Sequence, residues 1–254
     1  MIKREPLQSA AYFGSAIKFR REAIAKYEAK FQEQPLPFAR PDTAAASLLQ
    51  YHHSLLTAEY SCGYPVAQLA SYYPTIINSL ERLLLVDTEG VFAVNFKNGI
   101  DNYVEAIWLL SQAYLLGMGQ PELYRIVTYI GNEGQDLLFE KFASAIVPGL
   151  KRRPARKLLY SKAYQPLYDA ISAPVEQQPV LMQQFLRNWY GKMRDTGWYD
   201  AHKSPNGGGF DGYWCWEAAG VAVAFGIDDA SFCDMPYYPK DLADFARTKL
   251  QTGV

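Results

Sequence analysis

One carboxylate stands inside the most apolar stretch of the chain. The segment FDGYWCWEAAGVAVAFGIDD, residues 210–229, places Glu217 just after two tryptophans and ahead of a run of small apolar residues. A carboxylate in such surroundings must be paired, hydrogen-bonded or neutral. Glu217 is therefore either a general acid with a raised pKa, or a structural acid that accepts hydrogen bonds from Tyr, Trp or Arg side chains or from the amides of a helix start. No second carboxylate, histidine or metal ligand completes an obvious constellation, so the structural role is favoured.

The other chemically capable side chains form no recognisable catalytic or metal-binding pattern. Cys215 lies in the same apolar stretch, where a thiol behaves as a small hydrophobic group with a raised pKa. The adjacent His52 and His53 point to different sides of a helix, and His202 stands alone in a polar loop. There is no GxSxG elbow, no HExxH and no cysteine pair at zinc spacing. The sequence therefore predicts no catalytic residue, no metal site and no cofactor.

Two segments invite an anion-binding or nucleic-acid-binding interpretation, and neither supports it. The loop SPNGGGFDG, residues 204–212, has neither GxGxxG nor the Gly-Lys-Ser/Thr ending of a phosphate loop. The run KRRPARK, residues 151–157, is the main basic cluster, and it lacks the interleaved aromatic residues of a single-strand binder. With a net charge of −1, the chain also has no bulk field that attracts nucleic acid. We expect both segments to be solvated loops or helix starts.

The composition predicts a folded protein without membrane contact. The chain has 254 residues, of which 49% are hydrophobic and 20% charged, so it can bury a sizeable core. Its three cysteines are an odd number and give no disulfide framework. The first residues lack the continuous apolar region of a secretory signal, and no run reaches the roughly eighteen apolar residues of a membrane span. A cytoplasmic location is the expectation.

The charge is unevenly distributed along the second half of the chain. Residues 147–195 hold nine Lys and Arg against three Asp and Glu, whereas residues 196–254 hold four against eight. An acidic face is a plausible complement to a basic partner.

Apolar residues recur at spacings of three and four almost everywhere, which predicts an all-α fold, either a multi-helix bundle or a stack of helical hairpins in two closely packed parts. The best boundary is VPGLKRRPARK, where proline, glycine and a charge run coincide. It divides the chain into domains 1–147 and 148–254. Helices are expected at about 5–32, 42–60, 65–86, 99–117, 121–129, 133–147, 155–171 and 177–194, through the stretch around Glu217, and from about Pro239 onward.

The helix around Glu217 is expected to be apolar nearly all round and therefore buried nearly all round. Tyr213 and Trp214 are assigned to adjoining faces of this helix, Asp211 is assigned as its N-cap, and Gly226 suits the left-handed position that ends it. The small residues along it would let neighbouring helices approach closely.

The run GYWCWEAAGVAVAFGIDDASFCDMPYYPKDLADFAR, residues 212–247, strongly resembles the C-terminal signature of the PoNi immunity family. That pattern has an aromatic GYW start, a Glu-Ala-Ala helix, a hydrophobic residue before Asp-Asp, and then PYYPKDL. Residues 55–84 also look like the N-terminal domain of the family, with a helix that ends in Tyr-Ser-x-Gly before a second amphipathic helix. Cys215 and Trp216 replace a Ser or Ala and a Phe, which are exchanges between core residues. The structural signature residues are Tyr213, Trp214, Trp216, Glu217 and Asp241.

The resemblance implies an all-helical, two-part protein that binds and neutralises a cognate toxin effector. In this family the toxin belongs to an interbacterial competition system and is commonly a DNase or other nuclease, delivered by type VI secretion or another contact-dependent route. Because a nuclease must attract a polyanion, an inhibitor that covers its active site benefits from carboxylates. The residues expected to contact the toxin are Asp228, Asp229, Asp234, Tyr237 and Tyr238.

Several alternatives remain open from the sequence. The two tyrosines stand beside prolines and could instead fix the last helix, and the interface could lie on other loops or on a helical surface. The chain could also be a small α-helical hydrolase or lyase that uses Glu217 with Asp211 or His202. A third possibility is an adaptor or scaffold for an effector. Both a monomer and a homodimer are compatible with the sequence.

Overall fold

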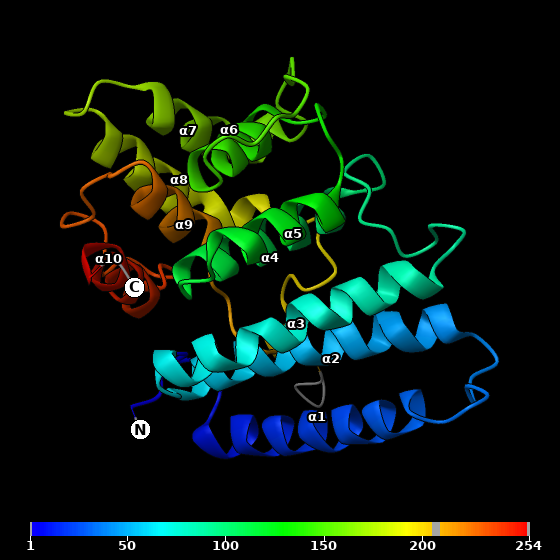
Figure 1. Cartoon of the computed structure of the whole chain (residues 1–254). Coiled ribbons are helices and arrows are strands. Elements are labelled where there is room, and N and C mark those ends of the chain that lie inside the picture. The colour runs from blue at the N-terminus through cyan, green and yellow to red at the C-terminus, as the bar shows by residue number, and fades with distance from the viewer. Residues whose placement is uncertain (1, 205–208, 253–254) are drawn as a thin grey trace. The chain divides into compact units, whose positions relative to one another are not determined.

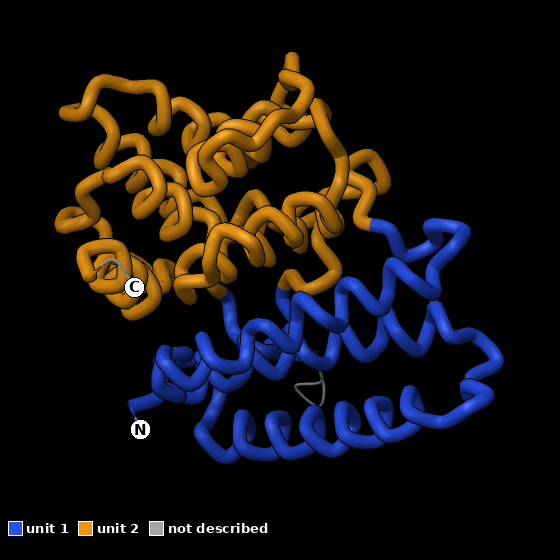
Figure 2. Tube along the Cα trace, in the orientation of Figure 1, with its two compact units in different colours: residues 1–93, 200–213 blue, residues 94–199, 214–254 orange. Residues whose placement is uncertain are grey.

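The computed structural model describes residues 2–204 and 209–252. These residues form ten α-helices and a short 3-10 helix, and no strand occurs among them, which confirms the all-α prediction (Figure 1). The chain divides into two compact units (Figure 2). Unit 1 contains residues 1–93 and 200–213, and unit 2 contains residues 94–199 and 214–254. The domains predicted from the sequence, 1–147 and 148–254, stay a prediction, and the compact units divide at other positions.

Unit 1 is built on three long helices, with α2 packed against both of the others (Figure 1). Their bounds are Ala10–Phe31 for α1, Pro41–Cys62 for α2 and Val66–Val86 for α3. The first helix was expected from residue 5, but it begins later because the Ser9 side chain accepts a hydrogen bond from the Tyr12 amide and caps it.

A glycine is required where α2 ends. Gly63 has a φ of 98°, and a Cβ atom at this position would lie 2.2 Å from the carbonyl oxygen of Ile2. The N-terminal segment passes this point because the Arg4 amide donates a 2.9 Å hydrogen bond to the carbonyl oxygen of Ser61. The close approach therefore depends on the missing side chain.

The segment 200–213 returns to unit 1 and packs on its helices. It carries the 3-10 helix Ala201–Lys203, and residues 205–208 of its glycine-rich loop lie outside the described residues. Tyr12 donates a 2.8 Å hydrogen bond to the carbonyl oxygen of Phe210. Arg20, itself buried, forms an ion pair with Asp211. Asp211 therefore holds this segment to α1, and its assignment as a helix N-cap is wrong.

The described residues of unit 2 form seven helices, one of which, α9, is almost completely buried. Every residue of α9 from Trp216 to Val223 is buried, and the helix contacts α4, α6 and α10. A Cβ atom at Gly220 would lie 2.9 Å from Ser111 Oγ and 3.0 Å from Phe142 Cζ, so this glycine permits the close packing that the sequence predicted. The helices are α4 (Ile100–Leu115), α5 (Gln120–Ile130), α6 (Leu137–Ile146), α7 (Ser161–Ser172), α8 (Gln178–Lys192), α9 (Trp216–Ala224) and α10 (Lys240–Thr252).

The start of α9 differs from the expectation. The helix begins at Trp216, and the two preceding residues that were assigned to its faces, Tyr213 and Trp214, lie in the segment before it. The reason is that the Cys215 amide donates a 2.8 Å hydrogen bond to the carbonyl oxygen of Tyr237 and not to a carbonyl of a preceding helical turn. The left-handed position at Gly226, with a φ of 65°, is confirmed.

Candidate partner-binding surface

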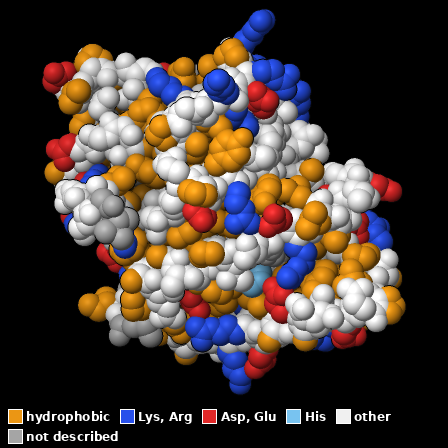
Figure 3. Space-filling model, in the orientation of Figure 1, with side chains coloured by type: hydrophobic (Ala, Val, Ile, Leu, Met, Phe, Trp, Pro, Cys, Tyr) orange, Lys and Arg blue, Asp and Glu red, His pale blue; other side chains and the backbone are white. Residues whose placement is uncertain are grey.

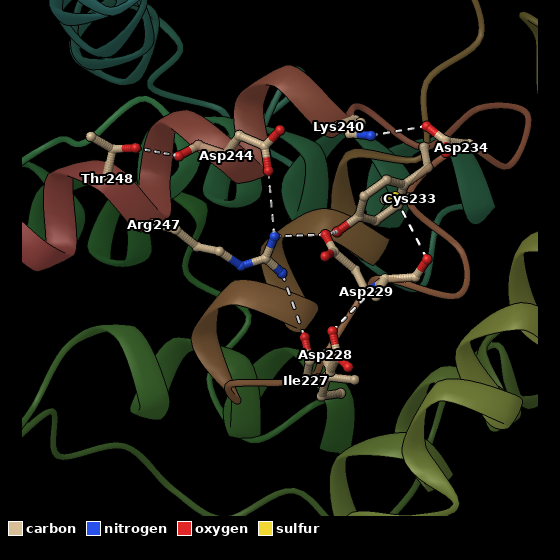
Figure 4. Close-up of polar contacts among 11 residues, drawn as sticks. Ile227, Asp228, Asp229, Cys233, Asp234, Lys240, Asp244, Arg247 and Thr248 are labelled. Atoms are coloured by element: carbon tan, nitrogen blue, oxygen red, sulfur yellow. Dashed lines mark hydrogen bonds and ion pairs between the residues drawn. The ribbon is translucent and has the colours of Figure 1, made fainter.

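Most of the acidic residues near the C-terminus lie on one continuous piece of unit 2. We call residues 227–247 the acidic segment; it contains five aspartates, one lysine and one arginine. It covers the turn after α9 and the first two turns of α10, and its polar contacts are drawn in Figure 4. The side chains of this segment fall into two groups, those that hold the turn together and those that face solvent.

Asp229 belongs to the first group. Its Oδ2 accepts hydrogen bonds from the Tyr238 hydroxyl at 2.8 Å and from Arg247 Nη1 at 2.7 Å, and its side chain is 13% exposed. Its carbonyl oxygen accepts hydrogen bonds from the Phe232 and Cys233 amides at 2.9 and 2.7 Å. Asp229 therefore links the turn to α10, as Figure 4 shows, and its carboxylate is largely committed within the chain.

The two tyrosines expected to contact the toxin are mostly internal. Tyr238 is buried, and burial followed by the nearby Asp229 carboxylate raises its pKa well above the usual value. Tyr237 is half-buried, with its ring stacked on Tyr190 at 5.4 Å between centroids and 5.3 Å from the ring of Trp189. It also has a positive φ of 71°, in the left-handed region. Both tyrosines thus shape the turn.

Four aspartates of the acidic segment are exposed. Asp234 is the most exposed, with 86% of its side chain accessible, and it accepts a 3.0 Å hydrogen bond from Lys240 Nζ. Asp244 is 59% exposed and lies 3.8 Å from Arg247. Asp228 and Asp241 are also exposed. These carboxylates are the groups of the segment that a partner can reach.

Glu217 is completely buried and accepts hydrogen bonds from side chains of three helices. Trp189 Nε1 and the Tyr164 hydroxyl donate to Oε1 at 2.7 and 3.1 Å, and Trp108 Nε1 donates to Oε2 at 2.8 Å. These donors come from α8, α7 and α4. Burial raises the pKa of Glu217, while its hydrogen bonds act in the opposite direction. Tyr and Trp side chains were among the donors expected for a structural carboxylate at this position.

The enzyme hypothesis requires Asp211 or His202 to act with Glu217, but both residues have other partners. Asp211 pairs with Arg20, and His202 Nδ1 forms a 2.8 Å hydrogen bond with the Tyr213 hydroxyl. Neither is among the hydrogen-bond partners recorded for Glu217 within the described residues. The remaining signature residues Tyr213, Trp214 and Trp216 are buried, and Asp241 is exposed.

Over residues 2–204 and 209–252, no group of three or more His, Cys, Asp or Glu side chains could hold a metal ion. Within the same ranges, no helix combines the length and the apolar character needed to span a membrane. On the face drawn in Figure 3, acidic and basic side chains are interspersed.

A further charged site in unit 1 was not anticipated. Glu59 is buried with only 4% of its surface exposed, and Arg21 Nη2 donates to its Oε1 at 2.6 Å. Its sequence signal is a carboxylate that falls on the buried side of α2, three residues after Leu56 and one before Tyr60. No local motif marks Glu59 as part of a charged pair, because its partner Arg21 is 38 residues away in the sequence.

The described residues define an all-helical, two-unit protein with exposed carboxylates on one segment of unit 2. The family model described as PoNe immunity protein (PoNi), N-terminal, matches residues 4–128, and the model described as PoNe immunity proteins (PoNi), C-terminal, matches residues 134–242. The chain belongs to the family of PoNe immunity proteins. This agrees with the resemblance seen in the sequence.

Comparison with solved structures supports the fold. The crystal structure of protein PA2201 from Pseudomonas aeruginosa is similar, with a TM-score of 0.66, 98% of this chain and 93% of that chain covered, and 18% sequence identity. At this identity the likeness shows the fold alone. No curated protein matches the sequence significantly.

Proposed function

We propose that this immunity protein neutralises a cognate nuclease toxin by forming a stoichiometric complex that occludes the toxin, and that it performs no chemistry. It acts in the cytoplasm of the cell that produces the toxin, and the toxin belongs to a type VI or other contact-dependent secretion system. Membership of the PoNe immunity family supports the immunity role. We add to this role that the toxin is a nuclease, that it is delivered by such a secretion system, and that it is inhibited by occlusion.

The observation that carries the proposal is the set of exposed carboxylates on the acidic segment. A nuclease binds a polyanion and therefore presents a basic surface around its active site. Complementary charge accelerates encounter and suppresses wrong partners. The segment presents Asp228, Asp234, Asp241 and Asp244 to solvent, and its turn is held by the contacts of Asp229 with Tyr238 and Arg247 (Figure 4).

Three of the five residues expected to contact the toxin have a different role in this proposal. Asp228 and Asp234 remain candidate toxin contacts. Asp229, Tyr237 and Tyr238 become supports that fix the turn on which the exposed carboxylates stand.

The test compares two double variants that change the net charge equally. Asp228→Lys with Asp234→Lys reverses two exposed carboxylates of the segment, and Glu176→Lys with Asp195→Lys reverses two exposed carboxylates elsewhere in unit 2. Affinity for the toxin encoded beside this gene is measured by calorimetry at low and at physiological salt. We expect the first variant to weaken binding by about tenfold or more, with a loss that shrinks at higher salt, and the second to change it little.

Both variants must first unfold in denaturant at the same midpoint as the parent protein. Equal affinity of the two folded variants would show that the acidic segment is not part of the interface. Protection against the toxin in co-expression, measured as growth, tests the immunity role itself. A chain that binds and exports the toxin without suppressing its toxicity would be an adaptor instead.

A further inference from the structure

Unit 1 contains a pocket that the proposed toxin-binding surface does not use. It has a volume of about 400 Å³ and lies among the three helices of this unit. Its lining includes Arg21 and Ile24 from α1, Leu55 and Glu59 from α2, and Gln68 and Tyr72 from α3. The lining thus combines the apolar side chains of Ile24 and Leu55 with polar and charged groups, which suits a site that binds one amphipathic side chain or a small ligand.

Glu59 is the buried charged group in the lining of this pocket. Its side chain is 5% exposed, and its recorded hydrogen bond within the described residues comes from Arg21 alone. A carboxylate can accept about four hydrogen bonds, so most of its capacity is unused. Burial raises the pKa of Glu59, and Arg21 only opposes this effect. The carboxylate would be stabilised by a further cationic donor.

The Glu59 carboxylate already binds one guanidinium group, that of Arg21. Arg21 Nη2 reaches Glu59 Oε1 at 2.6 Å, and the guanidinium carbon lies 5.6 Å from the centre of the Tyr64 ring. The Arg21 side chain is 50% exposed, so it borders both the pocket and solvent and can move into solvent. An incoming cation can displace Arg21, because the half-exposed guanidinium is easily rehydrated and the newcomer replaces its charge beside Glu59.

The groups behind Tyr72 add no net charge to the pocket, so Glu59 decides between a cation and an anion. The Tyr72 hydroxyl is hydrogen-bonded to Nδ1 of the buried His52, whose pKa is lowered by burial. On the far side of this histidine, Nε2 lies 3.5 Å from Glu28, which pairs with Arg82 at 2.8 Å. An anion in the pocket would face the Glu59 carboxylate, whereas the methylene stem of a lysine or arginine can pack on the apolar side chains of Ile24 and Leu55.

We propose that this pocket receives a lysine or arginine side chain of the bound toxin, which binds Glu59 in place of Arg21. The proposal rests on the proposed function for the identity of the occupant. It adds a contact in unit 1 that is independent of the acidic segment in unit 2.

The test uses a small probe, so that it does not depend on the toxin. N-acetyl-arginine amide is titrated into the full chain, and binding is followed by NMR at the amides of the pocket residues. Arg21→Ala should bind the probe more tightly than the parent protein, by up to about fivefold, because it removes the internal competitor. Glu59→Gln should weaken binding by about tenfold or more, because it removes the charge-assisted bond.

Matched controls lie on the same helix outside the pocket lining. Lys26→Ala removes an exposed cation of α1, and Glu22→Gln removes an exposed carboxylate next to Arg21. Both should leave the affinity for the probe unchanged within about twofold, which is the range of most surface substitutions. Circular dichroism and thermal unfolding establish that all four variants are folded.

Three results would overturn the proposal: no binding of the probe by folded Arg21→Ala, weaker binding by Arg21→Ala than by the parent, or a preference for N-acetyl-glutamate amide over the arginine probe. The toxin measurement separates the two proposals. If the probe binds as expected but the chain does not bind the toxin, the proposed function fails and the pocket chemistry stands. If the toxin binds while Glu59→Gln has no effect on it, the toxin does not use the pocket.

Discussion

Replacing Glu217 with glutamine tests whether this carboxylate is structural. The two side chains have nearly the same shape, so the change is confined to charge and hydrogen bonding. In the native protein three donors point at the carboxylate: Trp189 and Tyr164 at Oε1, and Trp108 at Oε2. A glutamine oxygen can keep the first two, but the amide nitrogen must then face the Trp108 N–H, where a donor meets a donor.

The expected cost follows from this geometry. One buried donor left without an acceptor costs about 1–3 kcal/mol, and the two remaining hydrogen bonds weaken because their acceptor is no longer charged. Removing a buried charge acts in the opposite direction. We therefore expect Glu217→Gln to lower the free energy of unfolding by about 2 kcal/mol. Glu217→Ala, which leaves three donors unpaired and creates a cavity, should cost about 5 kcal/mol.

Urea unfolding followed by circular dichroism measures these differences, with Glu176→Gln as an exposed control that should change stability by less than about 0.5 kcal/mol. Below its unfolding transition, Glu217→Gln should still bind the toxin and protect against it. A variant as stable as the parent would refute the structural argument. A stable variant that binds toxin normally but no longer protects would instead support a catalytic role for Glu217.

Two further substitutions test the packing and the electrostatics of the core. Burial raises the pKa of Asp211 to about 6 from its ordinary 3.8, against the effect of Arg20, so its contribution to stability is fully present below about pH 4 and is lost as the pH rises through about 6. The free energy of unfolding, measured in urea between pH 4 and pH 7.5, should fall by up to about 3 kcal/mol in the parent relative to Asp211→Asn. The same pH dependence in both proteins would contradict this. Gly220→Ala should destabilise the protein by about 1–3 kcal/mol, because the new methyl group would meet Ser111 and Phe142 of neighbouring helices. A thermal midpoint equal to that of the parent would show that these helices can separate freely.

The helices could be predicted from the sequence because the signals that define them are local. Apolar spacing and the proline and glycine positions predicted every long helix to within a few residues at most ends. The largest difference is at α7, which was expected from about residue 155 and begins at Ser161. The residues before it bond to the start of α6 instead, since the Lys157 carbonyl accepts from the Leu137 amide and the Leu159 amide donates to Asp136.

Two other differences also have identifiable causes. The helix expected from residue 133 begins at Leu137, because Asp136 caps it by accepting a 2.9 Å hydrogen bond from the Phe139 amide. The start of α9 depends on the Tyr237 carbonyl, which is more than twenty residues away and leaves no local signal.

The roles of individual carboxylates were harder to predict because they depend on distant partners. Asp228 and Asp229 are neighbours in the sequence and look equivalent, yet Asp228 is exposed and Asp229 is bound by Arg247, eighteen residues later. Asp211 resembled a helix cap, and its partner Arg20 comes from the other end of the chain. Tyr and Trp were among the donor types expected at Glu217, beside Arg and the amides of a helix start, because buried Tyr O–H and Trp N–H groups usually find a hydrogen-bond partner.

The two proposed toxin contacts should affect different rate constants. The carboxylates of Asp228 and Asp234 are exposed, so they act over a distance in water and should mainly set the association rate, with a strong salt dependence. Glu59 is buried, so a cation that reaches it is largely desolvated, and the contact should mainly set the dissociation rate. Surface plasmon resonance with the toxin would therefore show a slower association for the doubly reversed variant of the acidic segment and a faster dissociation for Glu59→Gln. The two effects should add in the combined variant, because additivity holds for sites without shared partners.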